Sequence, residues 1–472
     1  MLLGEVAEIL GTSSTSPERL ARGYSIDSRT LQPGQLFFAI RGPRFDGHLF
    51  VAKAFEGGAV GAVVERDRLT QYPPAFSAGL LGVANTAEAL QKLARAVRRK
   101  WGKALIAITG STGKSTTKEM AAAILGRRFK VLKSQGNLNN FYGLPLTLLA
   151  LEPAHEVAVA ELAMSAPGEI RLLTSIAEPQ VGVVTNVAPV HLEFFDSVDS
   201  IAQAKRELVE GLAPSATAVL NFDDARVRKF AEGFGGRIVT FGFDAGADFR
   251  ASILRPRPDG GTQFRVAGPQ FEARISLALP GTHNVQNALA AVAAASEFRL
   301  SPEDCEEALA AFQPLPQRSE ILTLPGGVTL ISDCYNSNPL AMEKMLEALA
   351  GWPSAGRRIL VAGEMLELGP TSPELHRQVG RKCSTSGVDW LLAVQGNARY
   401  LLEGAQEAGL AAERGRFFPG AREAGEFCRT LLQPGDVVLV KGSRGVHLET
   451  VVELLRSQAS DVQAESKTEL SS

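Results

Sequence analysis

Short apolar runs rich in β-branched residues recur along the chain, and each is followed by a stretch with helical character. Parallel strands joined by crossover helices produce this pattern, because strands covered on both faces are apolar throughout. The expected strands are residues 105–109, 157–160, 181–185, 359–362, 390–394 and 437–440. The sequence therefore predicts an α/β protein built on mostly parallel sheets.

Residues 237–280 have a different pattern, in which the apolar segments are shorter and alternate with polar residues. Segments 249–254, 263–266 and 271–279 are separated by Pro and Gly, as antiparallel strands joined by turns would be. We therefore expect a small antiparallel sheet to be added to the mostly parallel one.

The length of 472 residues exceeds one compact domain and, at about 150 residues per domain, favours three. Asn85 stands between an apolar run and a helical segment, and Pro314 and Pro316 interrupt helix and strand alike, so both places suit a boundary. We predict three domains and a tail: 1–85, 86–313, a Rossmann-like domain at 314–456, and a polar, disordered segment at 457–472.

The charges nearly balance, since 49 Lys and Arg face 51 Asp and Glu for a formal net charge of -2. Bulk electrostatics therefore recruits neither nucleic acid nor anionic lipid, and any bound polyanion must be held locally. The basic run at residues 95–100 lacks an aromatic array, and we interpret it as a solvated helix end. Four cysteines without a Cys-x-x-Cys pair argue against a disulfide framework and a zinc knuckle.

The N-terminus carries no basic leader, and no apolar run approaches the roughly 18 residues that a membrane-spanning helix needs. We therefore expect a cytoplasmic protein with no membrane span.

A phosphate-binding loop is the strongest local signal. An apolar strand delivers the chain to a tight glycine turn, and a run of helix-forming residues follows it, so backbone N–H groups can converge on phosphate oxygens at a helix N-terminus. Lys114 would reach the terminal phosphates, and the Ser115 hydroxyl would bind magnesium. Ile108 stands where the longer P-loop pattern has its first glycine. The predicted ATP-binding residues are Thr109, Gly110, Ser111, Thr112, Gly113, Lys114, Ser115 and Thr116.

Three further polar residues follow predicted elements of the same domain. Glu161 ends one strand, His191 lies beyond the strand at 181–185, and Lys205 lies on a helix. Residues at the carboxyl ends of parallel strands collect at the ligand crevice. Taken singly, each residue also has a purely structural explanation: Glu161 as a buried cap, His191 as a turn histidine and Lys205 as a surface lysine.

The motifs, in their order along the chain, resemble those of the Mur ligase family. The resemblance covers nearly the whole sequence and rests on the phosphate loop, Glu161, Asn186 with His191, Lys205, His283-Asn284 with Asn287, Arg318 and Asp333-Cys-Tyr-Asn-Ser-Asn-Pro. Within the family, Asn137, Asn139 and Asn140 in QGNLNN, residues 363–369 with His376, and Lys441-Gly-Ser443-Arg444 resemble the branch that adds D-alanyl-D-alanine to UDP-N-acetylmuramoyl-tripeptide.

The resemblance implies an ATP-dependent, magnesium-requiring amide ligase of peptidoglycan synthesis, and so a role in cell-wall biogenesis, cell shape and division. ATP would phosphorylate the peptide carboxylate, and the amine of D-alanyl-D-alanine would capture the acyl phosphate. The resemblance assigns catalysis to Lys114, Glu161, His191 and Lys205. Magnesium would be held by Ser115, Glu161, His191 and Lys205, the last as a carbamate formed with carbon dioxide.

The resemblance also implies where the other ligands bind. Asn284 and Asn287 fall on the adenine side, Arg318 on the phosphates, and Asp333 on the ribose. The substrate contacts would come from all three domains: Ser28, Arg29, Asp46, Gly47 and His48 for the uridine diphosphate sugar, Asn137, Asn139 and Asn140, and Lys441, Ser443 and Arg444 for the dipeptide carboxylate.

Other functions are compatible with a phosphate-binding loop. A sibling ligase that adds the third amino acid would carry an Asp-Asn-Pro-Arg signature, which this sequence lacks. A folylpolyglutamate synthase shares the ATPase core but lacks an N-terminal nucleotide-sugar domain such as residues 1–85 resemble. A P-loop NTPase without ligase activity is a different class. We expect a monomer that binds no nucleic acid.

Overall fold

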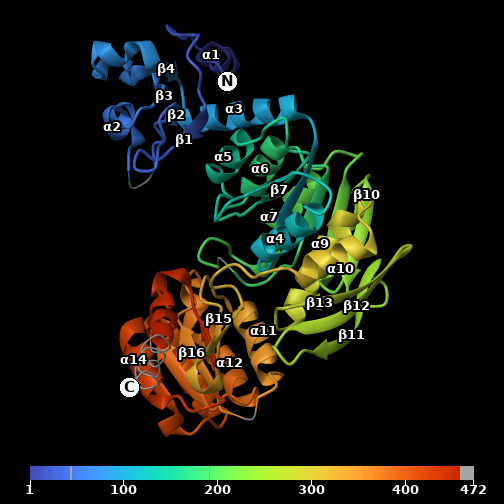
Figure 1. Cartoon of the computed structure of the whole chain (residues 1–472). Helices are drawn as coiled ribbons and strands as arrows, with labels where there is room; N and C mark the ends of the chain where they lie inside the picture. Colours follow the sequence, from blue (N-terminus) through green and yellow to red (C-terminus); the bar gives the residue numbers. More distant parts are fainter. Residues whose placement is uncertain (43–44, 191, 355, 458–472) are drawn as a thin grey trace, which may run out of the picture.

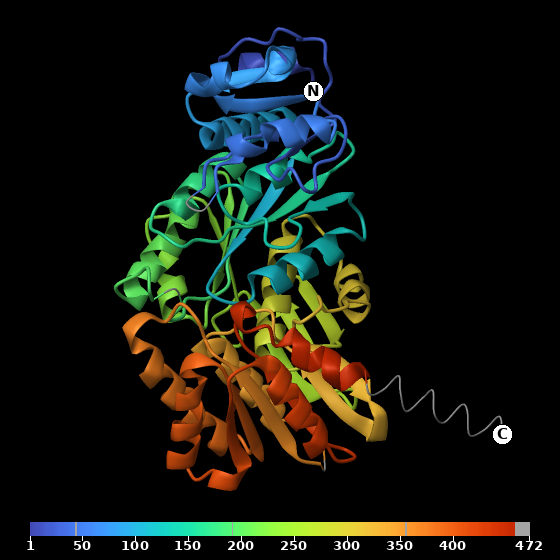
Figure 2. The same cartoon turned by 90° about the vertical axis from the view of Figure 1, so that its left-hand side faces the viewer.

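The computed structural model describes residues 1–42, 45–190, 192–354 and 356–457. Three sheets follow one another along the chain and along the long axis of the molecule (Figures 1 and 2). This α/β arrangement confirms the predicted fold class. The predicted tail falls outside the described residues except for Ser457. Within the described part, no helix is both long and apolar enough to cross a membrane.

The N-terminal sheet is parallel, in the order β1-β2-β3-β4. Alternate residues of β2 face opposite sides of the sheet: Leu36 packs with α1, while Phe37 packs with α2. The elements are α1 (Leu3–Leu10), β1 (Gly23–Ser25), β2 (Gln35–Phe38), α2 (Val51–Glu56), β3 (Gly61–Glu65) and β4 (Leu80–Val83).

The middle sheet has nine strands in the order β13-β12-β11-β10-β9-β8-β5-β7-β6. Its strands are β5 (Ala104–Thr109), β6 (Val131–Lys133), β7 (Val157–Glu161), β8 (Val181–Val184), β9 (Thr217–Asn221), β10 (Arg237–Gly242), β11 (Phe249–Pro256), β12 (Thr262–Gly268) and β13 (Phe271–Leu277). β11, β12 and β13 pair antiparallel, as the sequence predicts, and the parallel pairing of β10 with β11 joins them to the other strands. The antiparallel strands therefore continue the parallel sheet.

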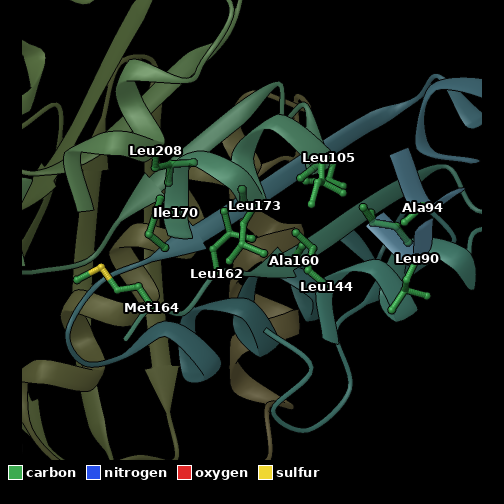
Figure 3. Packing of buried hydrophobic residues seen from close by; sticks show 14 of the residues in the cluster. Leu90, Ala94, Leu105, Leu144, Ala160, Leu162, Met164, Ile170, Leu173 and Leu208 are labelled. Carbon is green, nitrogen blue, oxygen red and sulfur yellow. The ribbon is translucent and has the colours of Figure 1, made fainter. Parts of the chain in front are cut away.

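Helices cover both faces of the middle sheet. The helices are α4 (Lys114–Leu125), α5 (Gly143–Leu149), α6 (Glu169–Ala177), α7 (Val198–Glu210), α8 (Ala225–Arg228), α9 (Thr282–Ser296) and α10 (Pro302–Ala310). α4, α9 and α10 share one core, and α5, α6 and α7 share the other. Figure 3 shows part of the second core, to which Leu173 of α6, Leu208 of α7 and Leu90 of helix α3 (Thr86–Trp101) belong. Each fully buried leucine contributes about 1.5–3 kcal/mol.

The C-terminal sheet has the order β14-β15-β19-β16-β17-β18, with only the edge strand β14 antiparallel. Its elements are β14 (Glu320–Leu324), β15 (Val328–Ser332), α11 (Pro339–Ala350), β16 (Arg358–Gly363), α12 (Ser372–Thr385), β17 (Trp390–Val394), α13 (Arg399–Glu407), β18 (Gly415–Phe418), α14 (Ala421–Leu431) and β19 (Val437–Lys441). This alternation of parallel strands and helices is the Rossmann-like arrangement expected here.

Helix α3 (Thr86–Trp101) links the first two sheets. Asn85 caps its N-terminus by accepting from the N–H groups of Ala87 and Glu88. Near its C-terminus, Arg98 donates to the carbonyls of Ala177 at 2.7 Å and Glu178 at 3.0 Å.

The interpretation of the basic run as a solvated helix end therefore holds for the exposed Arg99 and Lys100 but not for Arg98. Arg98 is buried, and Arg95 and Arg99 both pair with the carboxylate of Glu178. Sequence alone gave no sign of Glu178, which lies on a turn about 80 residues further along. The run anchors α3 to the middle sheet.

Replacing Arg98 by Met should lower the free energy of unfolding by about 2–4 kcal/mol, because the buried carbonyl of Ala177 and the partly buried carbonyl of Glu178 lose their donor. Arg99→Met is the matched control: its side chain is 59% exposed, and losing an exposed ion pair costs under about 1 kcal/mol. Urea denaturation of the two variants measures the difference. Equal midpoints would contradict the anchoring role of Arg98.

Candidate active site

The loop between β5 and α4 is held in shape by two glycines. Gly110 has φ 147° and Gly113 has φ 81°, backbone conformations that side chains disfavour. A Cβ on Gly110 would lie 1.9 Å from the Thr185 hydroxyl, and one on Gly113 would lie 2.1 Å from Oδ1 of Asn287. The loop can therefore pack closely only with glycine at both positions.

Asn186 braces the same loop from the end of β8. Its backbone carbonyl accepts from the N–H of Ser111 at 2.9 Å, and its Oδ1 accepts from the N–H of Thr112 at 3.0 Å. The sequence predicts that Asn186 directly follows a strand, so its place at the end of the sheet could be predicted. Its contact with the phosphate-binding loop could not be predicted.

Lys114 begins α4 and folds back over the loop. Its ammonium donates to the Gly110 carbonyl at 2.8 Å. Burial lowers the pKa of Lys114; the carboxylate of Glu161 partly offsets this shift, and the guanidinium of Arg318 adds to it. Since Arg318 comes from the C-terminal part of the chain, charges from two domains already meet at this ammonium.

Glu161 lies at the carboxyl end of β7 and is buried. Ser115 donates its hydroxyl to Oε2 of Glu161 at 2.7 Å, and Asn139 donates its amide to Oε1 at 2.9 Å. Asn140 instead accepts from the N–H of Gly143, the first residue of α5, while Asn137 is exposed. Of the three asparagines, Asn139 is the one that contacts the carboxylate.

Lys205 points inward from α7 and is only 3% exposed. Burial lowers its pKa well below the usual value, and the neighbouring charge of Lys114 lowers it further. The structure thus brings Lys114, Glu161 and Lys205 together, and the alternative of a surface lysine is wrong. His191 lies outside the described residues.

A cavity of about 580 Å³ opens beside Lys114 and Glu161, whereas Lys205 does not line it. Its walls come from the middle and C-terminal sheets and the segments that follow their strands, and among the described residues no N-terminal residue before Ser111 lines it. Predicted residues in its lining are Ser111, Thr112, Gly113, Lys114, Ser115, Thr116, Asn139, Glu161, Asn284, Asn287, Arg318, Asp333 and Lys441.

The C-terminal wall is built on an ion pair between Lys441 and Asp333. Nζ of Lys441 lies 2.5 Å from Oδ2 of Asp333, and the N–H of Ser319 donates to Oδ1 at 2.8 Å. The ammonium expected to receive a dipeptide carboxylate is therefore already paired within the chain. Ser443 likewise accepts from the N–H of Leu366, at 2.9 Å.

Tyr335 is a functional candidate that the sequence motif contains but that we did not single out. Its ring lies 3.9 Å below the guanidinium of Arg318 and 5.2 Å from that of Arg444. An aromatic face orients such a planar cation. Arg444 is exposed, so it remains available to an anion.

The asparagines assigned to adenine contact one another. Asn287 donates its amide to Oδ1 of Asn284 at 3.2 Å, and Asn284 donates its own amide to the Pro280 carbonyl at 2.8 Å. Since Asn287 also faces Gly113, this pair holds α9 against the phosphate loop.

The residues predicted in the N-terminal domain lie away from this cavity. Asp46 and His48 bond to each other at 2.6 Å, and the second ring nitrogen of His48 accepts from the N–H of Glu65. Gly47 packs against the backbone of Ile40, so both it and His48 serve the fold. Arg29 is exposed, pairs with Asp27, and follows the half-buried Ser28.

The chain matches three family descriptions in consecutive segments: "Mur ligase family, catalytic domain" at residues 21–98, "Mur ligase middle domain" at 108–295, and "Mur ligase, glutamate ligase domain" at 317–444. The chain belongs to the Mur ligase family. Because this family consists of ATP-dependent ligases that form amide bonds, this Mur ligase is an ATP-dependent amide ligase.

Similar proteins cover nearly its full length. The UDP-N-acetylmuramoyl-tripeptide–D-alanyl-D-alanine ligase of Bacillus subtilis is 34% identical over 95% of this chain and 96% of that protein. A crystal structure of MurF from Acinetobacter baumannii has a TM-score of 0.85 at 32% identity, covering 96% of this chain and 98% of that one. A MurF ligase from Thermotoga maritima in complex with ADP has a TM-score of 0.82 at 28% identity, with 94% and 99% covered.

Gly113→Ala should weaken ATP binding at least tenfold, because the new methyl group collides with Asn287 and distorts the loop. Gly168→Ala is a matched control: Gly168 also precedes a helix with φ 85°, but nothing lies within 4 Å of its added Cβ. Calorimetric titration with ATP compares the two. Equal affinities would show that the loop tolerates the collision.

Proposed function

We propose that this Mur ligase joins D-alanyl-D-alanine to UDP-N-acetylmuramoyl-tripeptide, with ATP converted to ADP and phosphate, as a monomer in the cytoplasm. The product is a peptidoglycan precursor, so the reaction supports cell shape and division. The observation that carries the proposal is the meeting of Lys114, Glu161 and Arg318 in the cavity shared by two domains, with the buried Lys205 next to Lys114. The full-length similarity to ligases named for this reaction supports it.

The reaction needs an activated carboxylate. A free carboxylate is a poor electrophile because its charge is delocalised and its oxygen leaves badly. Transfer of the γ-phosphoryl group of ATP to the terminal carboxylate of the tripeptide gives an acyl phosphate. The neutral amine of D-alanyl-D-alanine then attacks the carbonyl carbon, the C–N bond forms, phosphate leaves, and the amine loses a proton.

Cationic groups of the chain counter the charge that gathers in these steps. Lys114 and the N–H groups of the loop would face the triphosphate, and Arg318 would approach it from the opposite wall. Such preorganised charges act strongly in a cavity that excludes water. Asn284 and Asn287 would lie on the adenine side, and Asp333, held by Lys441, on the ribose.

The residues present fit a magnesium ion. The Ser115 hydroxyl and the Glu161 carboxylate lie together at the loop, and Mg²⁺ is usually held by one or two carboxylates with phosphate oxygens and water. Among the described residues, no group of three His, Cys, Asp or Glu side chains gathers for a metal, so Ser115 and Glu161 would hold the ion jointly with the nucleotide. When bound, it would neutralise phosphate charge.

Lys205 is suited to carbamylation. Its lowered pKa favours the neutral amine, which can add to the carbon of carbon dioxide and release one proton, leaving an anionic carbamate. That change would turn repulsion from Lys114 into attraction and supply an oxygen ligand. With Glu161 and His191, it would hold a second magnesium ion.

Substrate binding would extend over all three domains. The uridine diphosphate sugar would occupy the N-terminal domain near Ser28 and Arg29, where the exposed guanidinium can pair with phosphate. Asn139 would act beside Glu161. At the other end, Arg444 would receive the dipeptide carboxylate, with Lys441 and Ser443 fixing the wall behind it.

The decisive test measures phosphate release with UDP-N-acetylmuramoyl-tripeptide, D-alanyl-D-alanine and ATP, omitting each in turn, with mass spectrometry of the product. We expect release to require all three and the product to gain one D-alanyl-D-alanine unit. Release with ATP alone would favour a non-ligase NTPase. Addition of a single amino acid to a dipeptide precursor would favour the sibling ligase, and activity on folates would favour folylpolyglutamate synthase.

Lys205→Ala should lower kcat by about 100-fold or more, since it removes the proposed ligand, and acetate or bicarbonate should restore part of the activity. The exposed Lys229→Ala is the control and should match the wild type. Because the neutral amine is lost as pH falls through the lowered pKa, activity under limiting carbon dioxide should fall toward acid pH. Unchanged kcat in Lys205→Ala would remove this residue from the mechanism.

A further inference from the structure

Lys118 is a buried cation for which the proposed mechanism has no use. It lies one helical turn after Lys114 on α4, and its side chain is only 1% exposed. Burial of an ammonium is costly unless hydrogen bonds and an opposite charge compensate it. A helix that needed only apolar packing at this position would be better served by Met or Leu.

The compensation comes from two groups. Nζ of Lys118 donates to the backbone carbonyl of Ser134 at 2.6 Å and lies 3.1 Å from Oε1 of Glu119. Glu119 also pairs with Lys133, the last residue of β6. Lys118 therefore fixes the end of β6 to the helix that carries the phosphate loop.

Ser134 transmits this attachment to the active site. Its N–H donates to the Val159 carbonyl at 3.1 Å, and its hydroxyl oxygen accepts from the N–H of Glu161 at 3.2 Å. The carboxylate of Glu161 in turn accepts from the Ser115 hydroxyl at 2.7 Å. A closed path of hydrogen bonds thus runs from α4 through Ser134 and Glu161 back to the first turn of α4.

We propose that Lys118 is a positioning residue that, through Ser134, holds Glu161 in register with Ser115. The inference rests on the proposed function only in that Ser115 and Glu161 are taken as the magnesium ligands. Without the Lys118 bond, the Ser134 carbonyl loses its buried donor, and the turn after β6 relaxes. The Ser134 hydroxyl then no longer accepts from the N–H of Glu161, which fixes the backbone of that residue. Glu161 keeps its carboxylate, but no longer at a fixed distance from Ser115.

The test compares Lys118→Met with Lys103→Met. Lys103 also donates to two backbone carbonyls, those of Pro153 and His155, both at 2.7 Å, but it is exposed and lies at the start of β5. That end of the strand is about 20 Å from the phosphate loop. Both variants therefore lose lysine–carbonyl bonds, and only one loss lies beside Glu161.

The readout is the gain in affinity for a non-hydrolysable ATP analogue when Mg²⁺ is added, measured by calorimetry. In Lys118→Met, we expect this gain to fall about tenfold while the affinity without Mg²⁺ stays within twofold of wild type. In the ligase assay, kcat should fall about tenfold, and the KM values of the two peptide substrates should stay at their wild-type levels. Lys103→Met should match the wild type throughout.

A folded Lys118→Met with the wild-type magnesium effect would overturn the proposal. Where that variant does not fold, Ser134→Ala takes its place: it removes only the acceptor of the Glu161 N–H, and it should lose the magnesium effect in the same direction. A wild-type effect in Ser134→Ala would equally overturn the proposal. Because calorimetry uses no peptide substrate, this result is separate from a failure of the ligase reaction itself.

Discussion

The hydrogen bond between the Ser115 hydroxyl and the Glu161 carboxylate joins two elements on which the site depends. Ser115 belongs to the first turn of α4, and Glu161 ends β7, the strand beside β5. The bond, at 2.7 Å, forms only while β5, the loop and β7 keep their register. Gly110 and Gly113 make that possible, because any side chain at either position would displace the loop from the residues around it.

The part of the site built on strand ends could be predicted from the sequence. Carboxyl ends of neighbouring parallel strands meet at one edge of the sheet, so a carboxylate after 157–160 had to approach a lysine after 105–109. The structure brings Glu161 to Lys114 in this way. Lys205 followed only from resemblance, because a helical lysine carries no local mark of burial.

The partners of long side chains could not be predicted. Lys441 follows a terminal strand, which suited a carboxylate of the substrate, yet it pairs with Asp333 of its own chain across more than 100 residues. The sequence indicated that Arg98 is a surface residue, whereas in the structure it donates to a carbonyl of the α6–β8 turn. In both cases, sequence fixes the charge and the element, while tertiary packing decides which opposite group lies within reach.

The near neutrality of the chain hides a local excess of positive charge. Around the cavity, Asp224 accepts from the N–H groups of Val187 and Arg226, and Asp333 is paired with Lys441, so both carboxylates are compensated within the fold. At Lys114, the carboxylate of Glu161 offsets only part of the effect of burial, and the guanidinium of Arg318 adds a second positive charge from the opposite wall. A polyanion that enters between Lys114 and Arg318 would relieve the repulsion between these two cations. Affinity for a triphosphate can therefore arise from a few buried groups while the surface stays neutral.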